Sequence, residues 1–248
     1  MPDALKDATT RSTATLLTTL VAATAASYLV GYGVGSRWLL PVLNTAPAYG
    51  LMVWLLRRSE RRRAVSAMLV WAASLGLFGT GFAFFFPERA EVVTLNGEGY
   101  REPMIHWLRT GEGEEGRPAE FLPRHGRELL TYVPIALATA GAGAMLMGAV
   151  LMNFMDFFVA GAACVSSRPL TTAILAWFPW SVVRVVGYVV LGVILAEPML
   201  HRVGGSGSPR PAFAWRWLIF AGGCLVADVL IKASLAPWWG RMVGSYLE

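Results

Sequence analysis

The stretch of sequence that decides the fold runs from Leu129 to Val165 and reads LLTYVPIALATAGAGAMLMGAVLMNFMDFFVAGAACV. It is 37 residues long and almost wholly apolar, whereas one membrane crossing needs only about 20 residues. Asn153 and Asp156 interrupt it at the spacing of one helical turn. Polar groups at membrane depth are tolerated only inside protein or beside a water-filled cavity. This stretch therefore predicts a membrane protein with an irregular or polar-lined segment.

The composition of the whole chain is typical of a single membrane-embedded domain over residues 1–248. Hydrophobic residues make up 55% of the chain and charged residues 15%, whereas a soluble domain has about 25% charged residues. The net charge is +5, and a cluster of arginines between residues 57 and 63 supplies much of it. A basic cluster between two apolar runs is typical of a cytoplasmic membrane anchor. We therefore expect the lipid bilayer as a partner, and no nucleic acid.

Apolar runs separated by polar segments predict an all-α, polytopic helical bundle with six transmembrane helices. The predicted spans cover about residues 14–34, 38–56, 64–86, 129–151, 170–197 and 213–235, with a polar outer-face loop at 87–128. The rest of the long run is too short to cross again, because Phe157 to Val165 spans only about 14 Å as a helix. We expect a short interfacial or re-entrant helix at about 155–165. The alternative is seven spans, with two crossings between 129 and 168.

The basic residues of the short loops predict the orientation of the spans. Six spans leave only Arg37, Arg202, Arg210 and Arg216 on the outer side, and seven spans give a similar imbalance. Both alternatives place the N-terminus in the cytoplasm, but they differ on the side of the C-terminus. Arginine far outnumbers lysine, and alanine and glycine are abundant, which together indicate a bacterial inner-membrane protein.

Arg184 is the strongest candidate for a functional side chain. It lies near the middle of the predicted span 170–197, where an arginine costs roughly 2.5–3.5 kcal/mol on insertion scales. We expect it to face a carboxylate, and Asp156 is the nearest one in the sequence, with Asn153 one turn before it. Tyr188 lies four residues after Arg184 and is placed to stack on it. These residues predict either a polar intramembrane pathway or an ion pair that fixes helix register.

Two further polar pairs stand out. Asp228 and Lys232 are four residues apart on the last span, which predicts an intrahelical ion pair with Lys232 reaching toward the interface. His125 and Glu128 are three residues apart where the outer loop meets the fourth span, a spacing that offers two metal ligands. No third ligand is evident, so we expect no metal and interpret Glu128 as a helix-start signal. The chain has no HExxH, GxSxG or P-loop motif, so no catalytic residue and no cofactor is predicted.

Residues 64–197 resemble the stage II sporulation protein M family of bacterial membrane proteins. The resemblance rests on the HGREL segment at 125–129, the Gly-rich run from Gly141 to Gly161, and the FPW segment at 178–180. It implies a non-enzymatic protein that scaffolds partner proteins, with a layout similar to the permease subunits of ATP-driven exporters.

The leading hypothesis is therefore a non-enzymatic integral membrane protein, permease-like or a scaffolding subunit of a transport or envelope complex. Its expected partners are another membrane protein or a cytoplasmic ATPase, with a homo-oligomer as a further option. One alternative is a membrane-embedded enzyme that acts on lipid or an envelope substrate through His125 and Glu128 at the outer interface. The other alternative is a purely structural membrane oligomer.

Overall fold

A computed structural model describes the backbone of residues 3–203 and 214–247, and the side chains of residues 13–202 and 214–247. This described part of the chain is helical and contains no strand. Its elements are α1 (Asp3–Val34), α2 (Leu39–Arg57), α3 (Arg61–Phe85), α4 (Pro87–Val93), α5 (Gly97–Thr110), the 3-10 turn η1 (Glu114–Gly116), α6 (Pro118–Ala138), α7 (Ala142–Cys164), α8 (Pro169–Ala176), α9 (Pro179–Val203) and α10 (Trp215–Gly244).

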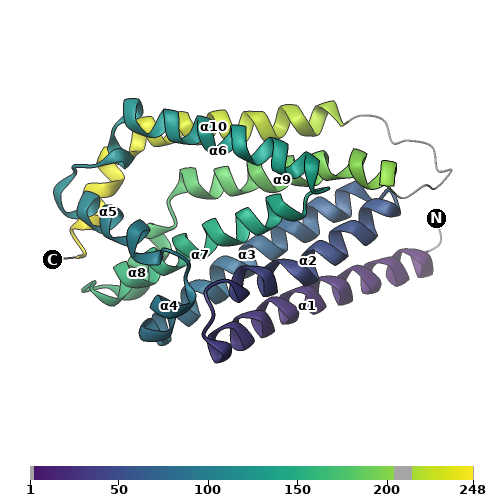
Figure 1. The fold of residues 1–248 in the computed structure, drawn as a ribbon, viewed down its shortest axis with the longest axis horizontal. Helices are drawn as coiled ribbons and strands as arrows, with labels where there is room; N and C mark the ends of the chain where they lie inside the picture. Colours follow the sequence, from purple (N-terminus) through teal and green to yellow (C-terminus); the bar gives the residue numbers. More distant parts are fainter. Residues whose placement is uncertain (1–2, 204–213, 248) are drawn as a thin grey trace.

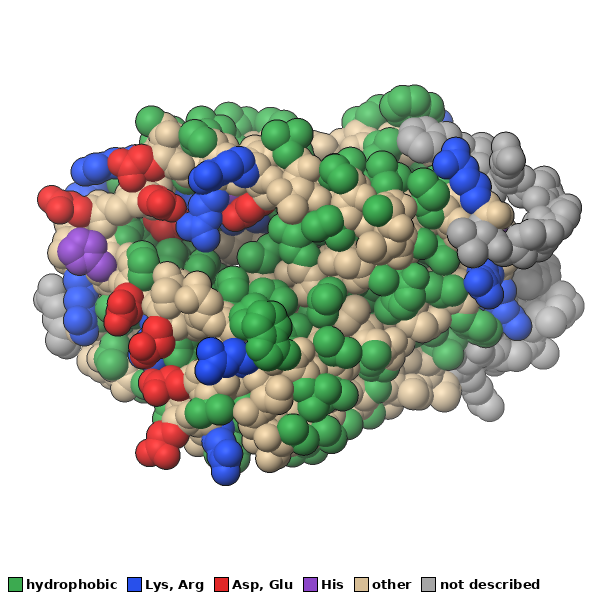
Figure 2. Space-filling view, in the orientation of Figure 1, with side chains coloured by type: hydrophobic (Ala, Val, Ile, Leu, Met, Phe, Trp, Pro, Cys, Tyr) green, Lys and Arg blue, Asp and Glu red, His purple; other side chains and the backbone are tan. Residues whose placement is uncertain are grey.

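Six of the described helices are long and apolar enough to cross a membrane, namely α1, α2, α3, α7, α9 and α10. Hydrophobic side chains cover much of the middle of the molecule, whereas acidic side chains gather at the end where α4 and α5 lie (Figures 1 and 2). The chain is a multi-pass membrane protein, and the predicted all-α bundle with six apolar spans is confirmed.

The fourth apolar span is α7, at Ala142–Cys164, so its predicted bounds of 129–151 are wrong. Asn153 and Asp156 do not break it, because other helices supply their hydrogen-bond partners within the bundle. The break falls instead just before α7, where Ala140 and Gly141 have φ values of 49° and 90°. This left-handed backbone ends a helix and is easily adopted by glycine. Residues 155–165 belong to α7 and form no separate helix.

The helix before this break, α6, is amphipathic rather than apolar. It runs along the bundle and packs on α7 and α9 (Figure 1). α6 therefore adds a seventh passage of the chain along the bundle, beside the six apolar helices. As a result, the start of α1 and the end of α10 lie at opposite ends of the bundle, as the seven-span alternative requires. Arg63 Nη2 donates to Thr13 Oγ1 (2.7 Å) at the first end, and Ser167 N donates to the Tyr246 carbonyl (2.9 Å) at the second.

Residues 87–128, predicted as a polar loop, are mostly helical, because α4, α5, η1 and the first half of α6 lie there. We call the end of the bundle at which these short helices lie the α5 end. The opposite end carries the arginine cluster of residues 57–63, and we call it the arginine end. There Arg61 Nε lies 2.7 Å from Glu197 Oε2, which ties the start of α3 to the end of α9.

The predicted fifth span, 170–197, is divided into α8 and α9 by Trp177 and Phe178. Phe178 precedes Pro179, and a residue before proline avoids helical backbone. Pro179 then begins α9, where its missing N–H is no loss, so the apolar span runs from Pro179 to Arg202. The last span is also longer than predicted, because α10 continues through Pro237. Residue 213, its predicted start, lies outside the described residues.

Candidate functional site

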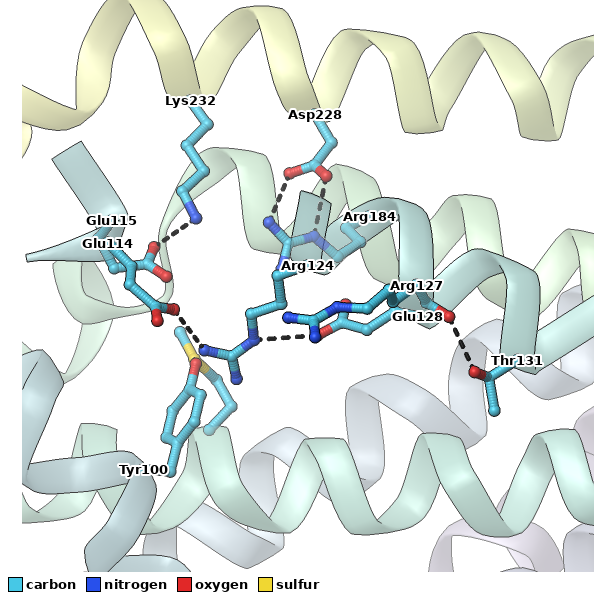
Figure 3. Close-up of polar contacts among 11 residues, drawn as sticks. Tyr100, Glu114, Glu115, Arg124, Arg127, Glu128, Thr131, Arg184, Asp228 and Lys232 are labelled. Atoms are coloured by element: carbon cyan, nitrogen blue, oxygen red, sulfur yellow. Dashed lines mark hydrogen bonds and ion pairs between the residues drawn. The ribbon is translucent and has the colours of Figure 1, made fainter. Parts of the chain in front are cut away.

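Charged side chains from η1, α6, α9 and α10 meet near the α5 end of the bundle (Figure 3). Arg184 donates two hydrogen bonds to the carboxylate of Asp228, at 2.8 and 3.0 Å. Lys232 Nζ lies 2.7 Å from Glu115 Oε2. The first pair joins the consecutive helices α9 and α10, and the second joins α10 to η1, which is far away in the sequence, so the two pairs hold α10 against α9 and η1.

Arg124 on α6 completes this set of ion pairs. Its Nη1 lies 3.0 Å from Glu114 Oε2, and its Nε lies 3.3 Å from Glu128 Oε1. The Arg124 side chain is 44% exposed, whereas that of Asp228 is only 3% exposed, so the set extends from the surface into the bundle. We call the seven residues the charged cluster: Glu114, Glu115, Arg124, Glu128, Arg184, Asp228 and Lys232.

The position of Arg184 differs from the prediction in two ways. Its partner is Asp228, so the predicted pairing with Asp156 is wrong. It also lies five residues after the start of α9, about 8 Å along the helix, and not in the middle of a span. The break before Pro179 causes the second difference, because it moves the start of the span toward Arg184. Tyr188 packs on Tyr132, with ring centroids 4.7 Å apart.

Lys232 does not form the predicted intrahelical pair with Asp228, and it does not reach the interface. Its side chain is only 1% exposed, and its ammonium lies 4.4 Å from the ring centroid of Phe121 as well as beside Glu115. A buried ammonium is stable only when it is paired. The prediction placed the Lys232 ammonium at the interface, where water would solvate it. In the structure, Glu115 and the Phe121 ring surround the ammonium instead.

A cavity of about 130 Å³ opens beside the charged cluster, inside the bundle. Its polar wall includes Glu115, Arg124, Glu128, Arg184 and Lys232. Its remaining wall is largely apolar and rich in methionine and aromatic side chains, among them Met52, Met68, Trp71, Met145, Met152, Met155 and Trp177. The cavity thus joins a charged surface to an apolar surface, and flexible methionine side chains adapt to ligands of varied shape.

His125 also lines this cavity, together with Glu128. Its ring packs against Phe121, with centroids 5.4 Å apart, and its buried Nδ1 has no hydrogen-bond partner in the described structure. Burial and the positive charges of Arg184, Lys232 and Arg124 lower the His125 pKa to about 3, so the ring is neutral at pH 7. The described residues contain no group of three or more His, Cys, Asp or Glu side chains able to hold a metal ion.

Asn153 and Asp156 belong to a separate buried network between α1, α3 and α7. The Tyr28 hydroxyl lies 2.8 Å from Asn153 Oδ1 and 3.3 Å from Asp156 Oδ2. Thr80 Oγ1 donates to Asp156 Oδ1 at 3.1 Å. Asn44 Nδ2 donates to Asn153 Oδ1 at 3.2 Å, which links α2 to the same network. The predicted set of polar intramembrane residues is therefore divided between two places in the bundle.

Sequence reasoning named Glu128 but missed four other members of these sites, Tyr28, Glu114, Glu115 and Arg124. Arg124 and Glu128 are four residues apart, so the helical spacing of opposite charges was a usable signal for that pair. Glu114 and Glu115 lie in a Gly-rich turn, and nothing local indicates that one of them would reach Lys232. Tyr28 had no sequence signal either, because a tyrosine in an apolar span is common at membrane interfaces.

The charged cluster and the cavity together can bind a small molecule that has both a charged and an apolar part. Three cations and two carboxylates line the cavity. The unpaired Nδ1 of His125 adds a polar group with unused hydrogen-bonding capacity. Comparisons of this chain with protein-family models, with curated proteins and with solved structures found no match.

Proposed function

We propose that this protein is a non-enzymatic, permease-like membrane protein that binds an amphiphile with an anionic headgroup. One observation carries this proposal: a cavity inside the bundle has a charged wall and an otherwise largely apolar lining. A purely structural ion-pair set needs no cavity beside it. Ligand sites in helical bundles are built from side chains on facing helices, as they are here.

The charges of the wall support an anionic headgroup. On the lining itself, Arg124, Arg184 and Lys232 outnumber Glu115 and Glu128, and the neutral His125 adds no positive charge. Glu114 and Asp228 give the whole charged cluster one more carboxylate than cations, but neither of them lines the cavity. An entering phosphate or carboxylate would replace Glu115 or Glu128 beside a cation, with little change in the total number of buried ion pairs. Such an exchange avoids the large penalty of leaving a buried charge unpaired.

The distribution of arginines over the fold supports one orientation of the protein in the membrane. The lengthwise pass of α6 places the end of α9 and the start of α10 at the arginine end, so Arg202 and Arg216 join the cluster of residues 57–63 there. Arg210 lies outside the described residues. The positive-inside rule then favours a cytoplasmic arginine end and an α5 end on the outer face of a bacterial inner membrane. We expect a partner such as a cytoplasmic ATPase to bind at the arginine end, as the resemblance to the sporulation family implies.

A binding measurement tests the proposal without a partner protein. The full chain in dodecyl maltoside is titrated with lysophosphatidic acid, or with lysophosphatidylcholine of the same chain length, and native mass spectrometry measures the bound fraction. We expect tighter binding of lysophosphatidic acid. Hydrogen bonds to charged groups contribute about 1.5–3 kcal/mol, so losing one should weaken binding roughly tenfold or more.

The variant Lys232→Met/Glu115→Met removes the buried pair as a unit, which avoids an uncompensated charge. Arg127→Gln is the matched control, because Arg127 is exposed on α6 and does not line the cavity. Weaker binding in the double variant and unchanged binding in the control support the proposal. Equal binding of the two lipids by the natural protein, or unchanged binding by the double variant, contradicts it.

The enzyme alternative is favoured by one observation, the joint presence of His125 and Glu128 on the cavity wall. Turnover of the same lysolipid, followed by mass spectrometry over hours, tests it. Product formation that is lost in His125→Gln supports an enzyme, whereas binding without product supports the permease-like role.

A further inference from the structure

A second hollow lies on the outer surface of the bundle, along α3, α8 and α9. It has a volume of about 720 Å³ and an almost wholly apolar lining. Several of its residues are strongly exposed, including Leu77, Phe85, Leu170 and Ile174 at 64–76%. These residues lie on membrane-crossing or adjoining helices, so the groove faces the hydrocarbon of the bilayer. It follows α3 from Leu69 to Phe85, a length of about 24 Å.

The groove and the cavity share a wall. Ala72, Met152, Trp177 and Val185 line both hollows. A thin layer of side chains therefore separates the charged interior from the lipid, and the largest of these side chains is Trp177. Lateral access to the cavity requires only that this layer move.

Trp177 occupies a position suited to movement. It lies between α8 and α9, outside either helix, at the break caused by Pro179. Its Nε1 donates to Thr80 Oγ1 at 3.3 Å, a long hydrogen bond. Its ring also lies so close to Gly76 that a Cβ there would sit 2.9 Å from Trp177 Cζ2. The indole is thus held close to α3 by one hydrogen bond and by the absence of a side chain at residue 76.

The volumes of the cavity and the groove indicate which part of an amphiphile each of them can hold. An engineered apolar cavity of about 150 Å³ holds one benzene molecule, so 130 Å³ accepts a headgroup of that size and no long chain. When the headgroup of an amphiphile is bound in the cavity, its hydrocarbon tail must therefore extend out of the cavity. The adjoining groove offers an apolar surface of hydrocarbon length at the shared wall.

We infer that the groove binds the long hydrocarbon tail of an amphiphile whose headgroup lies in the cavity, and that Trp177 gates the lateral opening between them. Because the tail belongs to the ligand proposed above, this inference rests on the proposed function. It adds a second binding site, a route of access from the bilayer and a gating residue.

Two open glycines allow the groove and the cavity to be blocked one at a time. A Cβ added at Gly81 in the groove, or at Gly148 in the cavity, meets no atom within 4 Å. Gly81→Phe and Gly148→Phe should therefore fold while filling the groove and the cavity, respectively. Gly50→Phe is the control, because Gly50 is equally open and lines neither hollow.

The probes are lysophosphatidic acid and glycerol 3-phosphate, which carry the same headgroup with and without a tail. Binding to the full chain in dodecyl maltoside is measured by native mass spectrometry for the first and by calorimetry for the second. We expect Gly81→Phe to weaken only lysophosphatidic acid, at least tenfold, and Gly148→Phe to weaken both probes. If Gly81→Phe leaves lysophosphatidic acid unchanged while Gly148→Phe weakens both, the tail site is refuted and the proposed function stands. If Gly148→Phe weakens neither probe, the proposed function itself fails.

The proposed gating role of Trp177 is tested by the rates at which a ligand binds and dissociates. Stopped-flow mixing of a fluorescent lysophosphatidic acid with Trp177→Ala should show association and dissociation at least tenfold faster than with the natural protein. Trp177→Phe, which keeps an aromatic ring over Gly76, should lie between the two. Unchanged rates in Trp177→Ala would refute the gate.

Discussion

Gly79 on α3 provides the sharpest test of the packing around Asp156. A Cβ at residue 79 would collide with the carboxylate of Asp156 and would sit 2.6 Å from the Tyr28 hydroxyl. Gly81, two residues further on, faces open space. Gly→Ala in a helix gains roughly 1 kcal/mol in the free energy of folding. At Gly79 that gain is opposed by roughly 1–3 kcal/mol of overpacking, and by roughly 1–3 kcal/mol if the buried hydrogen bonds of Asp156 are lost.

We therefore expect Gly81→Ala to be about as stable as the natural protein or up to roughly 1 kcal/mol more stable, and Gly79→Ala to be less stable than Gly81→Ala by roughly 1–6 kcal/mol. Reversible unfolding of the purified chain in mixed dodecyl maltoside and dodecyl sulfate micelles, followed by circular dichroism, measures this difference. The two variants share the same helix and the same chemical change, so helix propensity cancels. If Gly79→Ala is as stable as Gly81→Ala, the close approach of α3 to Asp156 and Tyr28 is refuted.

Three further outcomes are expected. Arg184→Ala leaves Asp228 uncompensated and should lower the free energy of unfolding by about 3–5 kcal/mol, and Arg184→Ala/Asp228→Ala should recover part of it in the same unfolding assay. The pKa of His125 is lowered to about 3 in the fold from about 6.5 in the unfolded chain, so its unfolded form binds the proton first and stability should fall as pH drops from 6.5 toward 3. His125→Phe should reduce that slope in thermal melts at several pH values, and an unchanged slope counts against the burial of this ring. Cys164 is exposed near the α5 end, so in a Cys224→Ser background an impermeant maleimide should label intact cells, and labelling only after lysis would reverse the proposed orientation.

Apolar run length was enough to predict the membrane class and the first three spans, because burial in lipid demands long apolar helices. It failed between 129 and 197. There the decisive groups were local ones, the left-handed backbone at Ala140 and Gly141 and the proline at residue 179. Asn153 and Asp156 suggested a break because polar groups in lipid are costly, but Tyr28 and Thr80 on other helices hydrogen-bond Asn153 Oδ1 and Asp156, which leaves only Asn153 Nδ2 of these two side chains without a partner in the described structure.

The candidate site was only partly predictable for a related reason. Arg184, Asp228 and Lys232 stood out as charges within apolar runs, which singles out residues but not their partners. The pairing of Lys232 with Glu115 depends on how η1 folds over α10, a contact across more than 100 residues. Helical spacing predicted an ion pair between Asp228 and Lys232, but in the packed bundle Asp228 pairs with Arg184 instead.

The amphipathic α6 also constrains how the protein is made. Its first turns carry Arg124 and Glu128, and Glu115 just before it pairs with Lys232, which the ribosome adds 117 residues later. At about 5–20 residues per second, that interval is about 6–23 s. Until α10 emerges, Glu115 has no buried ammonium to pair with, so this segment must wait at the membrane surface or beside the insertion machinery. The late synthesis of α10 therefore completes the charged cluster, and with it the insertion of a helix made long before.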